Sequence, residues 1–358
     1  MYPLDDGMFA PRNQWYIAAW SDEVGRTPME RWILDQPVAL YRREDGRAVA
    51  LDGRCPHRGF PFGKSEVIGD DIKCGYHGIR FGPDGRCVSI PTQAVVPSTC
   101  KVRSYPLVEQ WQWLWIWMGD PERADTGLIP SEDMLCLNDG LHTIAGGGYQ
   151  LVESRYMLLH DNLFDLTHLG HLHARSFGGG SGAQDTIPEV ITGPGTIGSL
   201  HTQRNVECPP FHAGSIDYTG LIDRYQGLTC HLPALHFGGQ QFNKAGTDEM
   251  LASVKVYHGI TPATRHSTHY FVATGQTWSK DVAVSQELLD YTLDVVLPED
   301  AMAAESIEQL VQKMGGKLDE ILLRADKVCV IGRRAIQALI EKDGVSPHVA
   351  HEGGRGLA

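Results

Sequence analysis

Two short segments of the sequence each pair a cysteine with a histidine: Cys55 and His57 in CPHRG, and Cys74 and His77 in CGYHG. Two kinds of metal centre in proteins are held by two thiolates and two imidazoles. One is a structural zinc site, and the other is a [2Fe–2S] cluster whose thiolates hold one iron and whose imidazoles hold the second. Zinc fingers commonly pair cysteine with cysteine and histidine with histidine, whereas each segment here supplies one of each. This pattern favours the cluster, with imidazoles near the surface where a redox partner can reach them.

A second group of acids and imidazoles lies in residues 161–173, DNLFDLTHLGHLH. We take His168 as the first ligand of a metal site in this segment. Asp165 lies three residues earlier and shares a helix face with it, so the Asp165 carboxylate can accept the ring N–H of His168. The second ligand is His171 if the helix continues, or His173 if the helix breaks.

A third ligand would complete a set of two histidines and one carboxylate, which leaves positions open for O₂ on Fe(II). Glu299 and Asp300 are the candidates outside the histidine-rich segment. Both follow Pro298 and precede a helical pattern, and acids are common at the start of a helix. From the residues alone, a role at the helix start is favoured over a role as ligand.

The composition is that of a globular protein of two ordinary domains, with 358 residues, 42% hydrophobic and 21% charged. The formal net charge of −13, with no Lys/Arg run, argues against a nucleic-acid or membrane-surface partner. No run approaches the roughly 20 apolar residues of a membrane span, and the start lacks the pattern of a signal peptide. We expect a cytoplasmic protein whose eight cysteines form no disulfides.

Elements that could position these residues differ between the two halves. Residues 13–118 alternate short apolar runs with Gly, Pro and Asp turns, which predicts an all-β half. The tryptophans at 111, 113, 115 and 117 have a period of two, which predicts a strand with all four indoles on one face. The second half is mixed. Its apolar pattern predicts strands at 197–206, 215–237 and 250–274, and then a helical region at about 283–340 that Pro298 interrupts.

The sequence resembles the Rieske non-haem iron oxygenases along nearly its whole length, in the branch of the vanillate and dicamba O-demethylases. The segments that carry the resemblance occur in the order of that branch: NQWYIAAW, ILDQPVALYR, CPHRG with CGYHG, LWIWMGDP, DNLFDLTHLGHLH, ITPATRHSTHYF and PEDAMAAE. The resemblance implies an α+β fold. It consists of an N-terminal all-β Rieske [2Fe–2S] domain, 1–124, and a catalytic domain, 125–358, whose curved antiparallel sheet is wrapped by helices.

The resemblance also assigns roles to the second group of residues. The iron motif of the family falls on Asn162, Asp165, His168 and His173, and its third ligand falls on Asp300. The resemblance thus implies that the second ligand is His173 and not His171. It also implies that Asp300 is a ligand, where the residues alone favoured a helix start. Asp165 takes the position that, in the family, links the cluster of one subunit to the mononuclear Fe(II) of its neighbour. A homotrimer is thereby implied.

The implied function is that of the terminal oxygenase of a Rieske monooxygenase system. Electrons would come from a separate NAD(P)H reductase, with or without a ferredoxin, since the sequence has no G-x-G-x-x-G motif after a strand. The implied reaction uses O₂ to demethylate a methoxy group of a small aromatic acid, with release of formaldehyde. The alternative is ring or methyl hydroxylation of an aromatic acid. A non-catalytic iron–sulfur electron carrier would leave 125–358 without a role.

Candidate substrate contacts are fewer and weaker. His258 matches a substrate-contacting histidine of dicamba demethylase, whereas the segment around residues 231–233 lacks the amide-bearing residue of that enzyme. Asn162, His231 and His236 are further candidates. For each of them the competing interpretation is a buried polar side chain that satisfies its hydrogen bonds within the core.

Overall fold

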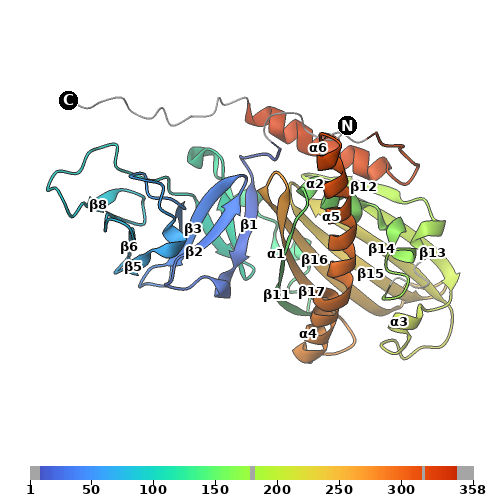
Figure 1. Cartoon of the computed structure of the whole chain (residues 1–358). Coiled ribbons are helices and arrows are strands. Elements are labelled where there is room, and N and C mark those ends of the chain that lie inside the picture. Colours follow the sequence, from blue (N-terminus) through green and yellow to red (C-terminus); the bar gives the residue numbers. More distant parts are fainter. Residues whose placement is uncertain (1–8, 178–181, 317–318, 345–358) are drawn as a thin grey trace.

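The computed structural model describes residues 9–177, 182–316 and 319–344. The N-terminal half contains three small antiparallel sheets. In the order of their pairing, these are β1 (Trp15–Trp20), β10 (Trp113–Trp117) and β9 (Leu107–Gln110); β2 (Met29–Ile33), β3 (Gln36–Arg42) and β4 (Ala48–Asp52); and β5 (Glu66–Ile68), β6 (Asp71–Lys73), β7 (Arg80–Phe81) and β8 (Cys87–Ser89). Figure 1 shows β5, β6 and β8 at one end of the molecule.

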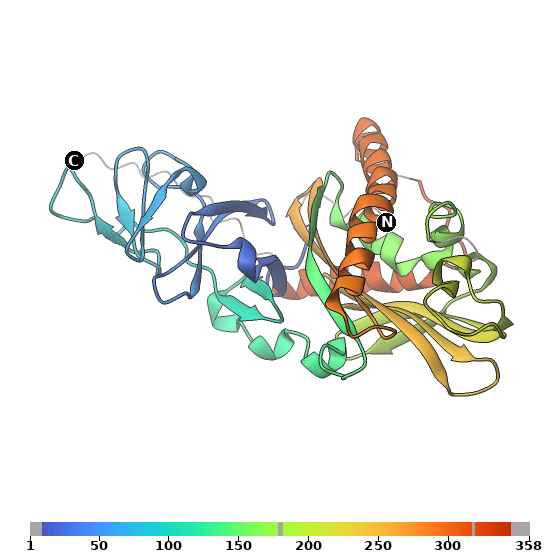
Figure 2. The same ribbon diagram turned by 90° about the horizontal axis from the view of Figure 1, so that it is seen from below.

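The C-terminal half is built on one antiparallel sheet of seven strands. Their order is β11 (Thr143–Val152), β17 (Ser267–Gln276), β16 (Met250–Thr264), β15 (Leu235–Lys244), β14 (Ile222–His231), β13 (Thr196–Val206) and β12 (Glu189–Gly193). The α-helices are α1 (Glu132–Leu135), α2 (Tyr156–Phe164), α3 (Pro210–Ala213), α4 (Val282–Tyr291), α5 (Leu297–Lys313) and α6 (Lys327–Asp343). Figure 2 shows the longer helices on one side of this sheet.

The predicted strand at 215–237 is in fact two strands, β14 and β15. The chain turns between them at Leu232–Ala234, because Pro233 has no backbone N–H to continue the ladder.

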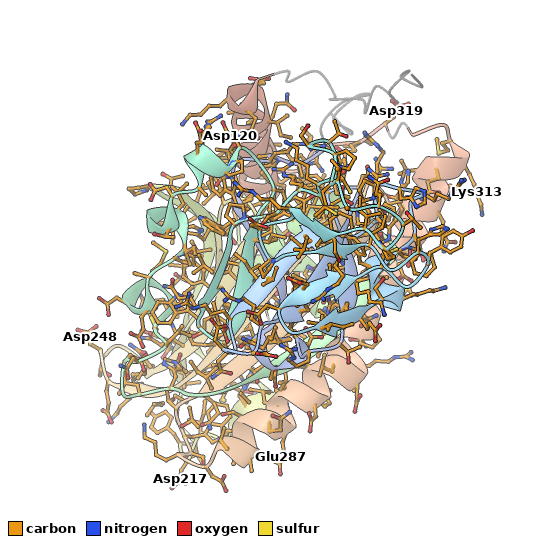
Figure 3. All side chains as sticks on the ribbon, turned by 90° about the vertical axis from the view of Figure 1, so that its left-hand side faces the viewer. Asp120, Asp217, Asp248, Glu287, Lys313 and Asp319 are labelled. Atoms are coloured by element: carbon orange, nitrogen blue, oxygen red, sulfur yellow. The ribbon has the colours of Figure 1, made fainter. Side chains whose placement is uncertain are left out.

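Among the described residues, no helix is long and apolar enough to cross a membrane. Exposed acids stand at the outer edge of the molecule, among them Asp217, Asp248 and Glu287 (Figure 3).

The predicted tryptophan strand joins the two halves. Trp113, Trp115 and Trp117 of β10 are buried in one cluster with aromatic residues of β16 and β17. Trp111 lies outside the strand, because it and Gln112 have φ angles of 60° and 65°, the backbone of a tight hairpin turn between β9 and β10. The Trp111 indole still packs against the edge of the cluster, so the halves share an apolar interface.

The predicted break at Pro298 is replaced by a change of helix type. The chain stays helical from Val282 to Lys313, and residues Thr292–Val296 form a π-helical segment between α4 and α5. Pro298 stands in the first turn of α5. Because proline has no N–H and crowds the preceding turn, the wider π turn accommodates it without ending the helix.

A buried ion pair fixes α2 against α5. Arg155, at the start of α2, donates from Nε and Nη2 to the carboxylate of Glu308 at 2.5 and 2.9 Å. Burial would raise the pKa of Glu308, but hydrogen bonds from Arg155, Gln312 and His266 outweigh it and lower the pKa to about 2. The pair therefore holds together α2, which leads into the histidine-rich segment, and α5, which carries Asp300.

We expect Glu308→Gln to lower the free energy of unfolding at pH 7 by roughly 3 kcal/mol, because the Arg155 charge is left buried without its partner. A depressed carboxyl pKa contributes stability above the unfolded value of about 4.3, and this contribution is lost as the pH falls toward the folded value. Denaturant unfolding between pH 7 and 2 measures both effects. Glu287→Gln, at an exposed site on α4, is the control, and equal stability of the two variants would contradict the expectation.

Candidate metal centres and active site

The two Cys–His segments fold into loops of the same construction. The N–H of Gly59 donates to the carbonyl of Cys55 at 2.8 Å, and the N–H of Gly78 donates to the carbonyl of Cys74 at 2.9 Å. Gly59 and Gly78 have φ angles of 68° and 71°, in the left-handed region that favours glycine. Each loop therefore closes four residues after its cysteine, and its histidine lies within the closed turn.

The four candidate ligands divide by burial. Cys55 and Cys74 are buried at 1% exposure each, while His57 and His77 are exposed with ring centroids 4.6 Å apart. Burial raises the pKa of the Cys55 thiol to about 12, and the adjacent Cys74 thiol adds to this effect. Two buried sulfurs beside two paired, exposed imidazoles fit a cluster with one iron held by thiolates and the other by histidines.

In the histidine-rich segment, α2 ends at Phe164 and a short 3₁₀ helix spans Leu166–Gly170. His168 Nδ1 lies 2.5 Å from the backbone oxygen of Asp165, which can only accept, so Nδ1 carries the proton. The Asp165 carboxylate instead caps the 3₁₀ helix by accepting from Thr167 N at 2.9 Å. The predicted bond from His168 to this carboxylate is therefore wrong, because the helix ends before the two residues can share a face.

The structure brings His168, His173 and Asp300 together, with one ligand atom of each within 4.8 Å of the others. Asp300 Oδ1 lies 3.6 Å from His168 Nε2 and 3.0 Å from His173 Nε2. His173 is fully buried and Asp300 is 7% exposed, whereas His171 lies on the surface. Asn162 Nδ2 donates to the same Asp300 oxygen at 2.9 Å.

The hydrogen bonds around these side chains fit a cation. Burial lowers the pKa of His168, so its ring is neutral at pH 7 and its Nε2 lone pair faces the Asp300 carboxylate. Burial also works to lower the pKa of His173, but Asp300 and Glu299 outweigh it and raise the pKa. A metal ion held by the two Nε2 atoms and the carboxylate would replace the proton on His173 and balance the negative charge of Asp300.

Glu299 orients one of the candidate ligands. Its carboxylate accepts from His173 Nδ1 at 2.6 Å and from Ser176 Oγ at 2.8 Å. A carboxylate that accepts the distal ring N–H fixes the tautomer of an imidazole whose other nitrogen binds metal. From the sequence, Glu299 was a candidate only for a ligand or a helix-start residue. Its position next to Asp300 is the sequence feature that could have indicated that it orients a ligand.

We expect Glu299→Ala to weaken iron binding at the histidine site by roughly 10- to 100-fold, because His173 loses the acceptor that orients its ring. Titration of iron into metal-depleted protein measures this affinity, and the cluster absorbance should stay unchanged. The matched control is Asp294→Ala, an exposed acid on the same continuous helix. Unchanged iron affinity in Glu299→Ala would contradict the role.

The three clustered side chains form one wall of a cavity of about 110 Å³, a size suited to a single aromatic ring. The other walls are mostly apolar, and His258 lines them. His258 Nδ1 lies 2.9 Å from the hydroxyl of Tyr270. Burial lowers the pKa of His258 to about 4, so the ring is a neutral hydrogen-bonding group at pH 7.

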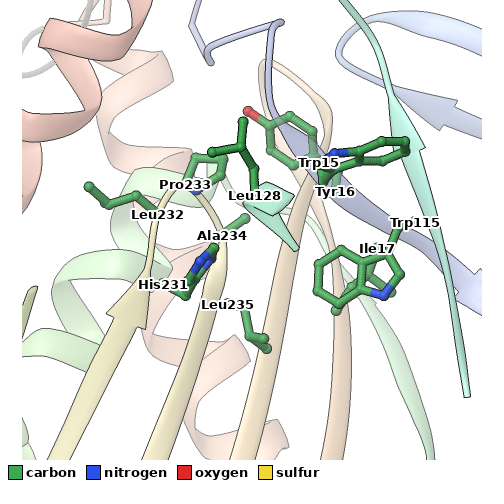
Figure 4. A pocket seen from close by; sticks show the side chains of 10 residues that line it. All are labelled: Trp15, Tyr16, Ile17, Trp115, Leu128, His231, Leu232, Pro233, Ala234 and Leu235. Carbon is green, nitrogen blue, oxygen red and sulfur yellow. The ribbon is translucent and has the colours of Figure 1, made fainter. Parts of the chain in front are cut away.

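The other two candidate contact histidines lie elsewhere. His236 is fully buried and pairs with His160 Nδ1 at 2.7 Å. His231 lines a separate crevice of about 10 Å³ between β1 and the β14–β15 turn, beside Trp115 and Leu128 (Figure 4). Neither lines the larger cavity: His231 faces the crevice, whereas His236 is on the same sheet face as His258 but is covered by its contact with His160.

Comparison with known proteins gives two matches to family profiles along the chain. The Rieske [2Fe-2S] domain matches residues 14–106, and the vanillate O-demethylase oxygenase C-terminal domain matches residues 152–342. This chain belongs to the Rieske oxygenases. The oxygenase therefore carries a Rieske [2Fe–2S] domain, as its Cys–His pairs predicted, and a zinc site is not the family's use of them. The predicted domain boundary at 124 lies between the two matches and stays a prediction.

Relatives match this oxygenase over almost their full length. The iron-sulfur subunit of the toluene-4-sulfonate monooxygenase system of Comamonas testosteroni is 31% identical over 94% of this chain and 99% of its own. The oxygenase component of dicamba O-demethylase from Stenotrophomonas maltophilia is 32% identical, over 92% and 97%. The resemblance to Rieske monooxygenase oxygenase components is confirmed.

Solved structures confirm the predicted fold class. Dicamba monooxygenase bound to 3,6-dichlorosalicylic acid superposes with a TM-score of 0.83 at 30% identity, over 93% of this chain and 98% of that one. Another structure of the same enzyme contains non-haem iron and dicamba. The fold is thus an all-β Rieske domain followed by a catalytic domain with a large antiparallel sheet and helices.

Proposed function

We propose that this oxygenase demethylates a methoxy group of a small aromatic acid, with a mononuclear Fe(II) held by His168, His173 and Asp300. The observation that carries the proposal is the position of these three side chains, which together form one wall of a mostly apolar cavity. The family's cluster would be held by Cys55, Cys74 and the two exposed histidines of their loops. An Fe(II) held by these two histidines and one carboxylate would supply the chemistry that activates O₂.

The side chains of the oxygenase bind and orient the substrate beside this wall. Leu228, Val254 and Val256 cover the sheet side of the cavity, where they can pack against an aromatic ring and exclude water. His258, neutral and held by Tyr270, offers one hydrogen bond to a polar ring substituent. Oxidation of a methoxy carbon yields a hemiacetal, which releases formaldehyde without a further catalytic group.

A second candidate reaction is hydroxylation of an aryl methyl group. It is favoured by the similarity to the toluene-4-sulfonate monooxygenase subunit, whose named substrate carries a methyl group and no methoxy group. Both reactions require a methyl carbon of the substrate to lie beside His168, His173 and Asp300. They differ in product, because only the methoxy group gives formaldehyde.

Electron supply requires other polypeptides and, we propose, other copies of this chain. The Cys–His loops belong to the N-terminal half, whose strands β5, β6 and β8 lie at one end of the molecule (Figure 1), and the histidine wall of His168, His173 and Asp300 belongs to the C-terminal half. A homotrimer would bring the loops of one copy to the wall of the next. Asp165 is half-buried and its carboxylate caps the 3₁₀ helix; in the trimer this carboxylate would accept a hydrogen bond from His77 of a neighbouring copy. A separate reductase, with or without a ferredoxin, would reach the exposed loop histidines. The expected cytoplasmic location stays a prediction.

The first experiment is electron paramagnetic resonance of dithionite-reduced protein, with analysis of iron and acid-labile sulfide. One cluster and one iron require about three irons and two sulfides per chain. Incubation with methoxy- and methyl-substituted benzoates, a reductase and O₂ then distinguishes the reactions through formaldehyde or a benzyl alcohol. Full metal content without either product, for any ring tested, would overturn the proposed substrate class.

A further inference from the structure

The sheet beneath the cavity changes from apolar to polar along its strands. Successive rows of cross-strand neighbours are His236 with His258, then Leu228 with Gly238 and Val256, then Gln226 with Gln240 and Val254. The first row lies toward Asp300, whose charge acts on the pKa of His258. The third row is four residues further along each strand, about 13 Å at about 3.3 Å per residue. An apolar row therefore separates the metal side of the cavity from a second polar group.

Gln240 is held in one orientation at this far end. The nearly fully buried Arg224 donates from Nε and Nη2 to Gln240 Oε1, at 3.0 and 2.5 Å. Both donors engage the amide oxygen, so the hydrogen-bond network assigns the amide nitrogen to the other side. Gln240 lines the cavity, and its Nε2–H group is left as a donor toward it.

Two buried polar atoms near Gln240 have no hydrogen-bond partner among the residues that the structure describes: Gln226 Oε1 and His212 Nε2. Both side chains are 3% exposed and line the same cavity. Gln226 is the cross-strand neighbour of Gln240, and the His212 ring lies 4.9 Å from Phe242, which also packs under the Arg224 guanidinium at 5.9 Å. Buried polar atoms are normally paired, so this convergence points to a ligand.

We propose that Gln240, His212 and Gln226 bind a terminal oxyanion of the substrate, a carboxylate or sulfonate, on the ring position opposite the carbon that is oxidised. This rests on the proposed function, which places that carbon at the histidine wall. Gln240 Nε2 and a protonated His212 Nε2 donate to the oxyanion, and the Gln226 amide donates after a half turn about its last bond. Arg224 is a positioning residue that supplies positive charge through Gln240.

Protonation states agree with these roles at pH 7. Burial lowers the pKa of Arg224 to about 10, so the guanidinium keeps its charge. Burial and the Arg224 charge lower the pKa of His212 to about 4, so the neutral ring carries one proton, which Nε2 can hold. Charge-assisted hydrogen bonds of this kind are shorter and stronger than those between neutral groups.

Anaerobic equilibrium dialysis with the metal-replete enzyme tests the proposal without turnover. The probes are 4-methylbenzenesulfonate, 4-methylbenzoate, their 3-methyl isomers, and the neutral compounds 4-methylanisole and 4-methoxyphenol. We expect at least one para anion to bind tenfold or more tightly than its 3-methyl isomer and both neutral compounds. The better para anion then identifies the oxyanion.

Variants separate recognition from folding. Gln240→Leu should abolish the preference for the para anion and change binding of 4-methylanisole by less than threefold, and Gln240→Glu should reverse the preference by charge repulsion while Arg224 stays in place. Gln241→Leu, the same change on the exposed side of the same strand, should have no effect. Equal binding of anions and neutral compounds, tight binding of 4-methoxyphenol, or an equal loss of both classes in Gln240→Leu would overturn the proposal. A normal binding preference without product would count against the proposed reaction only.

Discussion

Replacement of His173 by alanine is expected to remove the mononuclear iron and to reduce product formation by at least 1,000-fold, on the order of the loss when a catalytic metal is absent. His173 is fully buried, with Nε2 3.0 Å from Asp300 Oδ1, and His168 is the only other histidine of the described residues in this group of ligand atoms. The cluster belongs to the Rieske domain and not to the half that carries His173, so its paramagnetic resonance signal should persist. Iron analysis together with this spectrum measures the effect.

The matched control is His171→Ala, two residues earlier in the same segment. His171 is exposed and stands outside the group of candidate ligands, so iron content and activity should stay close to those of the unchanged enzyme. Retention of iron in His173→Ala, with loss in His171→Ala, would exchange the two assignments. A comparison of Tm values shows whether either variant has simply lost its fold.

For Asp165→Asn we expect intact metal centres and product formation reduced by roughly 10- to 100-fold, the typical loss when the hydrogen-bond acceptor of a metal-bound histidine is removed. In the proposed trimer the carboxylate accepts a hydrogen bond from a cluster histidine of the neighbouring copy. Its backbone oxygen holds His168 within the same chain. The amide removes the charge and leaves the backbone contact, so electron transfer between the centres should slow while substrate binding does not.

Single-turnover experiments measure this directly, because the cluster can be reduced in advance and its reoxidation followed after substrate and O₂ are added. The control is Asp161→Asn, which alters an acid in the last turn of α2 that is paired with Arg333 at 2.6 Å. It should affect stability more than reoxidation of the cluster. Normal coupled turnover in Asp165→Asn would falsify the bridging role.

The cluster site was predictable from the sequence because its parts are local. Each loop carries its cysteine, histidine and glycine within a few residues, and the turn that closes it depends only on them. The second group was predictable only in part. The spacing left His171 and His173 open because the end of α2 at Phe164 and the short 3₁₀ helix after it have no clear apolar period.

Two features could not be derived from local pattern. Asp300 meets His173 across 127 positions of sequence, and the residues alone favoured a helix-start role for it, so only the family resemblance favoured it as a ligand. The polar row at the far end of the cavity depends on the register that sets Gln226 opposite Gln240. Register follows from the pairing of β14 with β15, which neither strand specifies alone.

The π-helical segment Thr292–Val296 sets the rotational phase of α5. Each α-helical residue advances by about 100°, so a turn that holds one additional residue rotates everything after it by about a quarter of a revolution. α4 is anchored by its buried Ser285 and Leu289, so the rotation falls on Asp300 and Glu308, which are both buried. Deletion of one residue here would swing the carboxylate of the histidine wall and the partner of Arg155 outward together. The number of residues in the π-helical segment is therefore as important for the geometry of the site as the identity of its side chains.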